Sequence, residues 1–162
     1  MYSVGDKIVY PMHGACIIDG IEEKEILGEK EEYYILRFPF GKMRVMVPIK
    51  KVDEVGIRGI ISKEEIEDVV RVLKGDQTKM PSNWNRRYRY NMDKIRSGDI
   101  YQVADVVRNL MIRDRDKGLS TAERKLLTNA KRILVSEIAL SKDAEEQDVI
   151  DLVDKVTLEE SV

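Results

Sequence analysis

The sequence predicts an α+β fold in two parts, a small β-barrel over residues 1–60 and an all-α bundle of about five helices over residues 61–162. Two observations lead to this prediction. The first 55 or so residues contain short runs rich in Val, Ile and Tyr, separated by turn residues. After Gly59 the period of the apolar residues changes from about 2 to about 3.6, so strands give way to helices.

The predicted strands are the runs KIVY, ACIIDGI, EYYILRF and MRVMV. Turn signals separate them at Pro11–Gly14, Leu27–Lys30 and Pro39–Gly41. Four or five short strands at this spacing are typical of a small barrel, whose interior is filled by side chains and holds no wide ligand cavity. The exposed strand edges are then the natural interaction surface.

Serine caps and chain breaks divide the helical part. Ser62 and Ser120 each precede a glutamate by three residues, which is the capping-box pattern, and Ser82 is the expected cap of a second helix that ends near Arg96. The expected stops are Gly75, the segment Ser97–Asp99 and Gly118. A last, acidic helix is expected over Ala144–Leu158.

Charge is segregated along the chain, although the net charge is only −2. Residues 82–132 carry 13 Lys and Arg against 6 Asp and Glu, whereas residues 133–162 carry 2 against 9. A basic segment beside an acidic one predicts one surface that faces a polyanion and another that stays in solvent. The alternative is that the two stretches pair with and neutralise each other.

The composition argues against several classes of protein. With one cysteine, Cys16, and one histidine, His13, neither an internal disulfide nor a zinc site is expected. The start of the chain lacks the order of a signal peptide and no run of about 18 apolar residues occurs, so we expect a cytoplasmic protein. Phosphate-binding glycine loops and a nucleophile with an oriented base are also missing, which favours a binding protein without cofactors over an enzyme.

The segment PSNWNRRYRY places the only tryptophan, Trp84, beside three arginines and two tyrosines at a helix start. Arginines contact phosphates, and a large flat side chain can wedge into a disturbed base step, so the segment suits duplex DNA at a junction. The alternative is a buried tryptophan, because Trp84, Tyr88, Met92 and Ile95 have the spacing of a core-facing stripe. Spacing alone favours the buried position.

More cations flank Gly118, namely Arg108, Arg113, Arg115 and Lys117 before it and Arg124, Lys125, Lys131 and Arg132 after it. A helical hairpin would bring them together for contact with the DNA backbone rather than with bases. Three acidic residues lie among them, so a solvated charged turn remains the alternative.

The run MRVMV ends at Pro48, which is typical of an edge strand. Such an edge offers unpaired backbone groups to a partner's sheet. An ordinary edge protected by Arg44 is the alternative.

Several collinear motifs together resemble the CarD/CdnL family of bacterial transcription regulators, in its short, stand-alone type. The motifs are VGDKIVYPMHGA, GEKEEYYILRF followed by MRVMVP, PSNWNRRYRYN, SGDIYQVADVVRNL and RDKGLSTAERKLL. The resemblance covers nearly the whole chain. It implies that the N-terminal barrel is Tudor-like and binds the β subunit of RNA polymerase. It also implies that the helical part contacts promoter DNA at the upstream edge of the melted region.

The resemblance further implies roles for individual residues. Trp84 would be the wedge in the minor groove, against the prediction from spacing. The residues expected to contact the DNA backbone or to adjoin the wedge are Arg86, Arg87, Arg89, Arg113 and Arg124. The residues expected to bind polymerase are Lys24, Arg44, Val45, Met46 and Val47, with Met46 standing where a relative has an arginine.

The expected activity is stabilisation of the open promoter complex, without catalysis and without sequence-specific readout. The protein is expected at the nucleoid through RNA polymerase, with no membrane or small-molecule partner. A protein-only adaptor, which would use the Tudor-like part and keep Trp84 buried, is the alternative.

Overall fold

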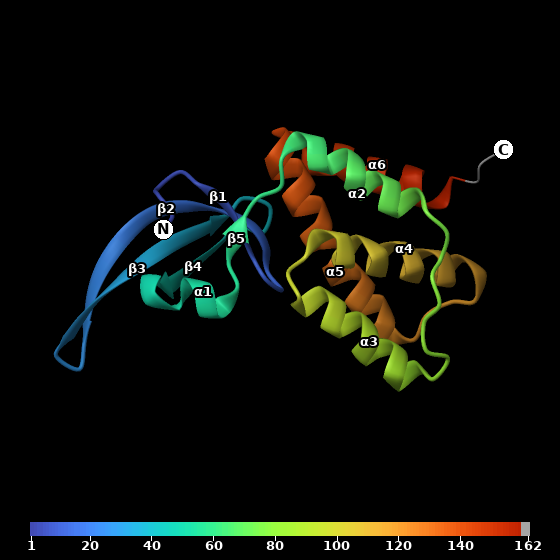
Figure 1. The fold of residues 1–162 in the computed structure, drawn as a ribbon, viewed down its shortest axis with the longest axis horizontal. Coiled ribbons are helices and arrows are strands. Elements are labelled where there is room, and N and C mark those ends of the chain that lie inside the picture. Colours follow the sequence, from blue (N-terminus) through green and yellow to red (C-terminus); the bar gives the residue numbers. More distant parts are fainter. Residues whose placement is uncertain (160–162) are drawn as a thin grey trace.

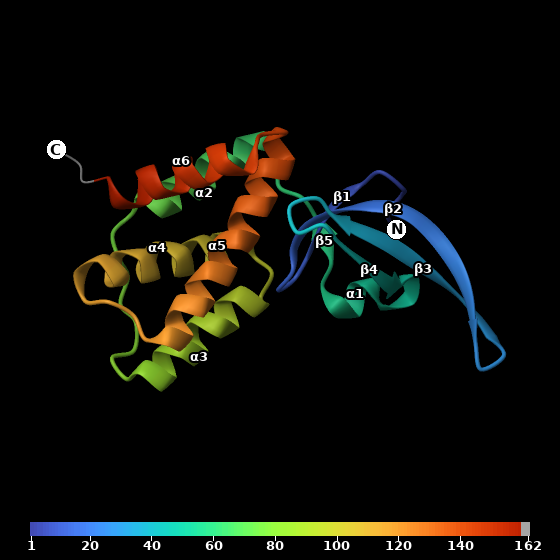
Figure 2. The same ribbon diagram turned by 180° about the vertical axis from the view of Figure 1, so that it is seen from behind.

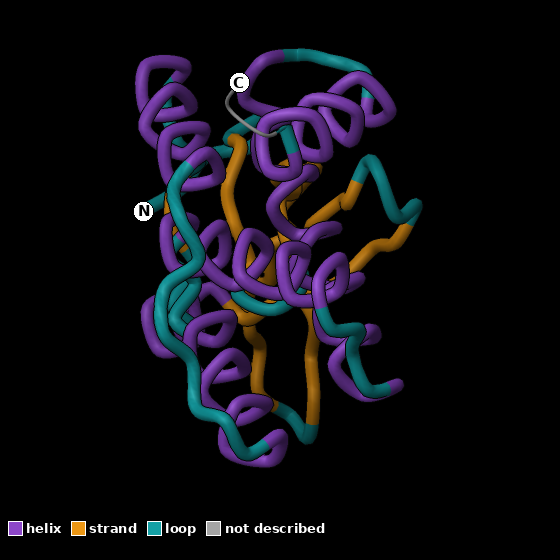
Figure 3. The backbone as a smooth tube through the Cα atoms, turned by 90° about the vertical axis from the view of Figure 1, so that its right-hand side faces the viewer, coloured by secondary structure: helices purple, strands orange, loops and turns teal. Residues whose placement is uncertain are grey.

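The computed structural model describes residues 1–159 and places an antiparallel sheet beside a bundle of helices (Figure 1). Seen from the helical end, the helices lie in front of the strands (Figure 3). The strands are β1 (Lys7–Tyr10), β2 (Gly14–Ile26), β3 (Glu29–Phe38), β4 (Met43–Pro48) and β5 (Arg58–Gly59), in the spatial order β4-β3-β2-β1-β5. The α+β class and the change from strands to helices near residue 60 are therefore confirmed.

The predicted closure into a barrel is wrong, because the sheet is open. β4 and β5 stand at its two ends and do not pair with each other within residues 1–159. A 3₁₀ turn, η1 (Ile49–Lys51), and a short helix, α1 (Val52–Val55), connect them, and the sequence did not predict either. Val52 and Ile57 join Ile8 and Leu36 in the core of the sheet, so this connection covers the core in place of strand pairing.

The longest strands form an arm that extends beyond the rest of the sheet. β3 pairs with β4 only from Tyr33 to Phe38, and β1 pairs with β2 only from Gly14 to Ile17. Apart from Glu22, which pairs with Tyr33, residues 22–32 of β2 and β3 therefore pair only with each other. We call residues 22–32 the β2–β3 arm; it projects away from the helices (Figure 1).

The helices after residue 60 are α2 (Lys63–Lys74), α3 (Trp84–Arg96), α4 (Ile100–Asp116), α5 (Thr121–Lys142) and α6 (Glu146–Leu158). Two predicted caps are confirmed, since the hydroxyls of Ser62 and Ser120 each accept a hydrogen bond of 3.2 Å from the backbone N–H three residues later. The cap predicted at Ser82 is wrong by one residue. Asn83 caps α3 instead, and its side chain accepts a hydrogen bond of 3.2 Å from the N–H of Arg86. Asparagine and serine are equally good caps, so local sequence did not separate them.

The C-terminal half of α5 joins the two parts of the molecule, and α5 runs from beside α3 to the sheet (Figure 2). Ser136 accepts a hydrogen bond of 3.0 Å from the N–H of Ala15. The carboxylate of Glu137, which is 1% exposed, accepts two hydrogen bonds of 2.7 Å from Arg58 and one of 3.0 Å from the N–H of Ile61. The sheet is thus attached to the bundle by a hydrogen-bonded ion pair as well as by apolar packing.

Replacement of Glu137 by glutamine should destabilise the protein strongly, because it leaves Arg58 partly buried without a counter-charge. Breaking a buried pair typically lowers the free energy of unfolding by about 3–5 kcal/mol. Asp143→Asn is the matched control, since it neutralises an exposed acid that pairs with Lys7 at 3.0 Å and should cost far less. Equal losses in urea unfolding for the two variants would contradict a structural role for the Arg58–Glu137 pair.

Candidate nucleic-acid interface

Trp84 is the first residue of α3, and half of its surface is exposed (50%). Along the same stripe Tyr88 and Met92 are partly buried and Ile95 is buried against the bundle. Trp84 therefore continues the apolar stripe by one turn beyond the end of the core. The burial that its spacing predicted is wrong, because periodicity identifies the face of a helix but not the point where its neighbours end.

Two of the arginines next to Trp84 are free to contact an anion. Arg86 and Arg89 are exposed, and neither forms an ion pair within residues 1–159. Both lie on the side of α3 that faces away from the bundle, where side chains can reach phosphate oxygens.

Arg87 is different, because its side chain is buried in an ion pair. Its guanidinium donates to both carboxylate oxygens of Glu123, at 2.7 and 2.9 Å, and the two side chains are 4% and 2% exposed. It also donates to the backbone carbonyl of Ser82 at 3.0 Å. The hydrogen bond from Arg87 lowers the pKa of Glu123, which keeps this carboxylate charged. A direct DNA contact does not fit Arg87, which instead holds the start of α3 on the start of α5.

The chain that leads to Trp84 is held at a second place. Asn109 of α4 is fully buried, and its side chain accepts from the N–H of Thr78 at 3.1 Å and donates to the hydroxyl of Thr78 at 2.8 Å. Arg108, also buried, donates to the carbonyl of Val72 at 2.9 Å. The loop between α2 and α3 is thus fixed on α4, and Arg108 is a structural residue rather than part of a basic surface. The sequence held no signal for this network, because it joins an irregular loop to a helix about 30 residues away.

The hairpin predicted around Gly118 is present between α4 and α5. Gly118 has a positive φ of 82° and its N–H donates to the carbonyl of Arg113 at 3.0 Å. Arg124 lies on the surface, where it pairs with Asp114 at 3.4 Å, and Lys125 is exposed next to it. Arg113 is only partly exposed. The structure therefore brings the start of α3 and the start of α5 together through Arg87 and Glu123. Arg124 follows Glu123 on α5.

The residues expected to bind polymerase lie on two strands of the N-terminal sheet. β4 is at one end of the sheet, which confirms the predicted edge strand. Arg44 is exposed and pairs with Asp19 at 2.8 Å, whereas the Val47 side chain is buried in the core and offers only its backbone. Lys24 lies on the β2–β3 arm opposite Glu31, and β3 separates it from β4. The two groups thus do not form one continuous patch along a single strand.

Comparison with known proteins identifies the family. The sequence model of the CarD C-terminal domain matches residues 68–154, and that of the CarD-like/TRCF RID domain matches residues 2–61. The chain belongs to the CarD family. This confirms the resemblance seen in the sequence and makes the chain a member of a family of transcription regulators, which is not a known family of enzymes.

One relative is YdeB from Bacillus subtilis (strain 168), which is described as a candidate transcription factor. It is 39% identical to this chain over 149 residues, and these cover 92% of this chain and 97% of YdeB. The solution structure of the 72-residue N-terminal domain of Myxococcus xanthus CarD is 37% identical, with a TM-score of 0.32 over 36% of this chain and 79% of that domain. CdnLNt from Myxococcus xanthus is 44% identical, with a TM-score of 0.35 over 39% of this chain and 89% of that structure.

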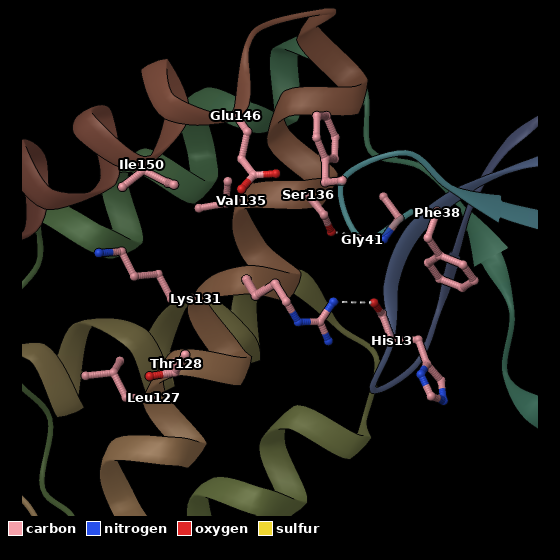
Figure 4. Close-up of a pocket in the computed structure, with 13 residues that line it drawn as sticks. His13, Phe38, Gly41, Leu127, Thr128, Lys131, Val135, Ser136, Glu146 and Ile150 are labelled. Carbon is pink, nitrogen blue, oxygen red and sulfur yellow. Dashed lines mark hydrogen bonds between the residues drawn. The ribbon is translucent and has the colours of Figure 1, made fainter. Parts of the chain in front are cut away.

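A cavity of about 380 Å³ lies where the sheet meets α5 and α6 in this CarD family protein (Figure 4). Its walls are largely apolar and include Phe38, Phe40, Leu127, Val135 and Ile150. Two of the residues that line it are joined, since Arg132 donates to the carbonyl of His13 at 3.0 Å, a further link between the two parts.

Cys16 is buried in the core of the sheet, and desolvation raises the pKa of its thiol to about 12, so it is protonated at neutral pH. Within residues 1–159 no group of three His, Cys, Asp or Glu side chains is arranged to hold a metal. In the same part of the chain no helix is both long and apolar enough to span a membrane.

The Arg87–Glu123 pair can be tested with Trp84 fluorescence, since Trp84 is the only tryptophan. Glu123→Gln should lower the free energy of unfolding by about 3 kcal/mol or more, because Arg87 is then buried without a counter-charge. Because the pKa of Glu123 is lowered in the folded protein, the stabilisation that its charge provides is complete above the pKa of this group in the unfolded chain. That stabilisation is lost as pH falls through the lower pKa of the folded state. The difference between wild type and Glu123→Gln should therefore shrink in acid.

The double variant Arg87→Met with Glu123→Leu separates stability from positioning. Replacing both charges by apolar side chains should restore most of the stability. It also removes the hydrogen bond to Ser82, so time-resolved anisotropy should show faster local motion of Trp84. Arg89→Met, which removes an exposed arginine, is the control and should leave both properties unchanged. Unaltered Trp84 motion in the double variant would show that the pair does not hold the start of α3.

Proposed function

We propose that this protein binds the β subunit of RNA polymerase through residues 1–60 and stabilises the open promoter complex through residues 61–162. The helical part would contact DNA without sequence-specific readout at the upstream edge of the bubble. The observation that carries the proposal is the position of Trp84, a half-exposed tryptophan at a fixed helix start. Arg86 and Arg89 follow it on the same helix and form no ion pair in the described part of the chain. A large aromatic side chain outside the core contributes little to its own fold and suits a wedge between base pairs.

The surrounding groups support contact with the DNA backbone. Arg86 and Arg89 on α3 and Arg124 on α5 are exposed, and such cations position a protein on a duplex without reading its sequence. Arg113 would add a contact from the end of α4. Arg87 would act indirectly, by holding Trp84 in place. Membership of a family of transcription regulators agrees with these roles.

Docking on polymerase would compensate for weak DNA binding. The net charge of −2 gives the whole chain little general attraction to DNA. The N-terminal part would attach to polymerase through Lys24 and through the β4 edge, which includes Arg44, Val45 and Met46. This attachment would raise the local concentration of the helical part at the promoter. With this arrangement the protein would act in the cytoplasm at the nucleoid, without a cofactor.

Trp84 shifts the closed-to-open equilibrium only if it binds the open state more tightly. A difference of about 1.4 kcal/mol changes this equilibrium about tenfold. One stacked aromatic side chain contributes about 1–3 kcal/mol per base, which is enough. A protein-only adaptor needs no exposed tryptophan, so the exposure of Trp84 favours the DNA-contacting function.

The lifetime of polymerase–promoter open complexes tests the proposal at one fixed salt concentration. The wild-type protein should lengthen this lifetime by up to about tenfold, and Trp84→Ala should lose most of the gain while still binding polymerase. Leu158→Ala, which truncates an exposed apolar side chain on α6, should behave as wild type. A wild-type protein that leaves the lifetime unchanged would contradict the proposed function.

Arg44 tests the docking edge. Arg44→Glu should weaken binding to purified RNA polymerase about tenfold or more with only a small loss of stability. The Arg44–Asp19 pair is largely exposed on the arginine side, and Arg37 still pairs with Asp19 at 3.1 Å. Lys155→Glu introduces the same charge change on α6 and should leave polymerase binding unchanged. Equal binding by wild type and Arg44→Glu would remove Arg44 from the docking surface.

A further inference from the structure

The cavity between the sheet and the helices lies where three apolar clusters meet without joining (Figure 4). Phe38 in its wall belongs to the core of the sheet, Val135 to the core of the bundle, and Ala15 to a small cluster between them. A space of about 380 Å³ is far larger than the voids of a well-packed interior. The protein itself therefore fills the joint between its two parts incompletely.

The size and lining of the cavity suit a small molecule. Sites for small molecules typically have volumes of about 300–1,000 Å³ and apolar walls with a few polar groups. Phe38, Val135 and Ala15 are between 2% and 4% exposed, whereas His13 and Thr128, which also line the cavity, are exposed, so a solute can enter from solvent. Water makes few hydrogen bonds in an apolar space, while an apolar ligand gains dispersion contacts with the walls.

Arg132 supplies a positive charge to the wall. Its guanidinium donates to the carbonyl of His13 at 3.0 Å and to the side-chain oxygen of Asn129 at 2.8 Å, and it forms no ion pair within residues 1–159. A guanidinium has more N–H donors than these two hydrogen bonds use. Arginine is also the side chain best suited to hold a carboxylate, because its N–H groups can donate in parallel to both oxygens.

The two other charged residues in the wall are accounted for by the fold. Lys131 forms an ion pair with Asp154 of α6, which neutralises its charge. Glu146 is the first residue of α6, where a carboxylate is stabilised by the positive end of the helix dipole. Arg132 is therefore the charged group of the wall that remains available to a ligand.

We propose that this cavity binds a small carboxylic acid with an apolar chain, such as a medium-chain fatty acid. The chain would lie against Phe38, Val135 and Ile150, and the carboxylate would accept hydrogen bonds from Arg132. A neutral apolar molecule would leave the free donors of Arg132 unused, and a cation would be repelled by it. Among the described residues, none of those proposed to contact DNA or polymerase lines the cavity, so the inference goes beyond the proposed function and does not depend on it.

A ligand at this place would contact both parts of the molecule. Phe38 and Phe40 belong to the end of β3 and the turn after it, whereas Leu127 and Val135 belong to α5 and Ile150 to α6. A ligand that binds both sides favours the arrangement in which both sides are in reach. Occupancy of the cavity would therefore stabilise the joint between the sheet and the bundle.

Titration of octanoate into the full chain, followed by calorimetry, tests the proposal. Octanoate should bind saturably at one site, with a negative change in heat capacity, and should raise the midpoint of thermal unfolding. Octanol and octylammonium have the same chain and should bind about tenfold more weakly or less, because neither accepts a charge-assisted hydrogen bond from arginine. No saturable binding of octanoate, or equal binding of the three compounds, would show that the proposal is wrong.

Substitutions of charged residues test the position of the carboxylate. Arg132→Gln should weaken octanoate binding about tenfold. Arg71→Gln, which removes an exposed arginine of α2 that pairs with Asp68, is the matched control and should bind as wild type. Glu146→Gln should bind at least as tightly as wild type, because it removes a negative charge from the wall. Unchanged binding by Arg132→Gln, or weaker binding by Glu146→Gln, would contradict recognition of a carboxylate.

Ile150→Phe tests whether the apolar chain lies in the cavity. Ile150 is partly buried, and a larger side chain there should fill part of the space, so the thermal midpoint should not fall while octanoate binds at least tenfold more weakly. In the wild type, octanoate should also slow amide hydrogen exchange in residues 38–41 and 146–150. Slower exchange only around Trp84 or another exposed apolar residue would place the ligand elsewhere and overturn the proposal. These measurements involve neither polymerase nor DNA, so their failure would leave the proposed function intact.

Discussion

The contact between Arg58 of β5 and Glu137 of α5 joins the sheet to the bundle, and the arrangement of the molecule depends on it. Glu137 is nearly inaccessible to solvent. Besides the hydrogen bonds from Arg58, it accepts one from the N–H of Ile61, where the chain passes from the sheet to the bundle. Ser136 beside it binds the start of β2. The proposed function needs such a joint, because a loose connection would not keep the proposed protein-binding and DNA-binding surfaces at a constant separation.

Burial divides the basic residues of this protein into two groups with different tasks. Arg58, Arg87 and Arg108 donate to buried carboxylates or backbone carbonyls and organise the fold. Arg86 and Arg89 remain in solvent, next to Trp84, and are available to phosphates. The buried arginines do not contact DNA in our proposal, yet one of them holds the start of α3. Loss of function in an arginine variant can therefore arise from either group, and measurements of stability and tryptophan motion separate the two causes.

The two ends of the molecule have opposite charge. The start of α3 is basic and carries Trp84, whereas the β2–β3 arm is acidic and carries Leu27. This polarity agrees with one end that contacts DNA and another that contacts protein. It would also discourage the wrong orientation, because the acidic arm would be repelled by the DNA that the helical end is proposed to bind.

The sequence by itself determined β1 to β4 and the helices after residue 60, the caps at Ser62 and Ser120, the hairpin at Gly118 and the family, because these depend on short-range patterns and on collinear motifs. Tertiary structure decided the rest. Whether the sheet closes into a barrel or stays open depended on η1 and α1, which cover the core between β4 and β5. No local pattern in the sequence describes this packing. Trp84 and Arg87 lie three residues apart on one helix, yet one is exposed and the other buried, because the neighbouring α5 begins beside Arg87 and the core ends before Trp84. Periodicity is a property of one segment, whereas burial depends on which other segments lie next to it.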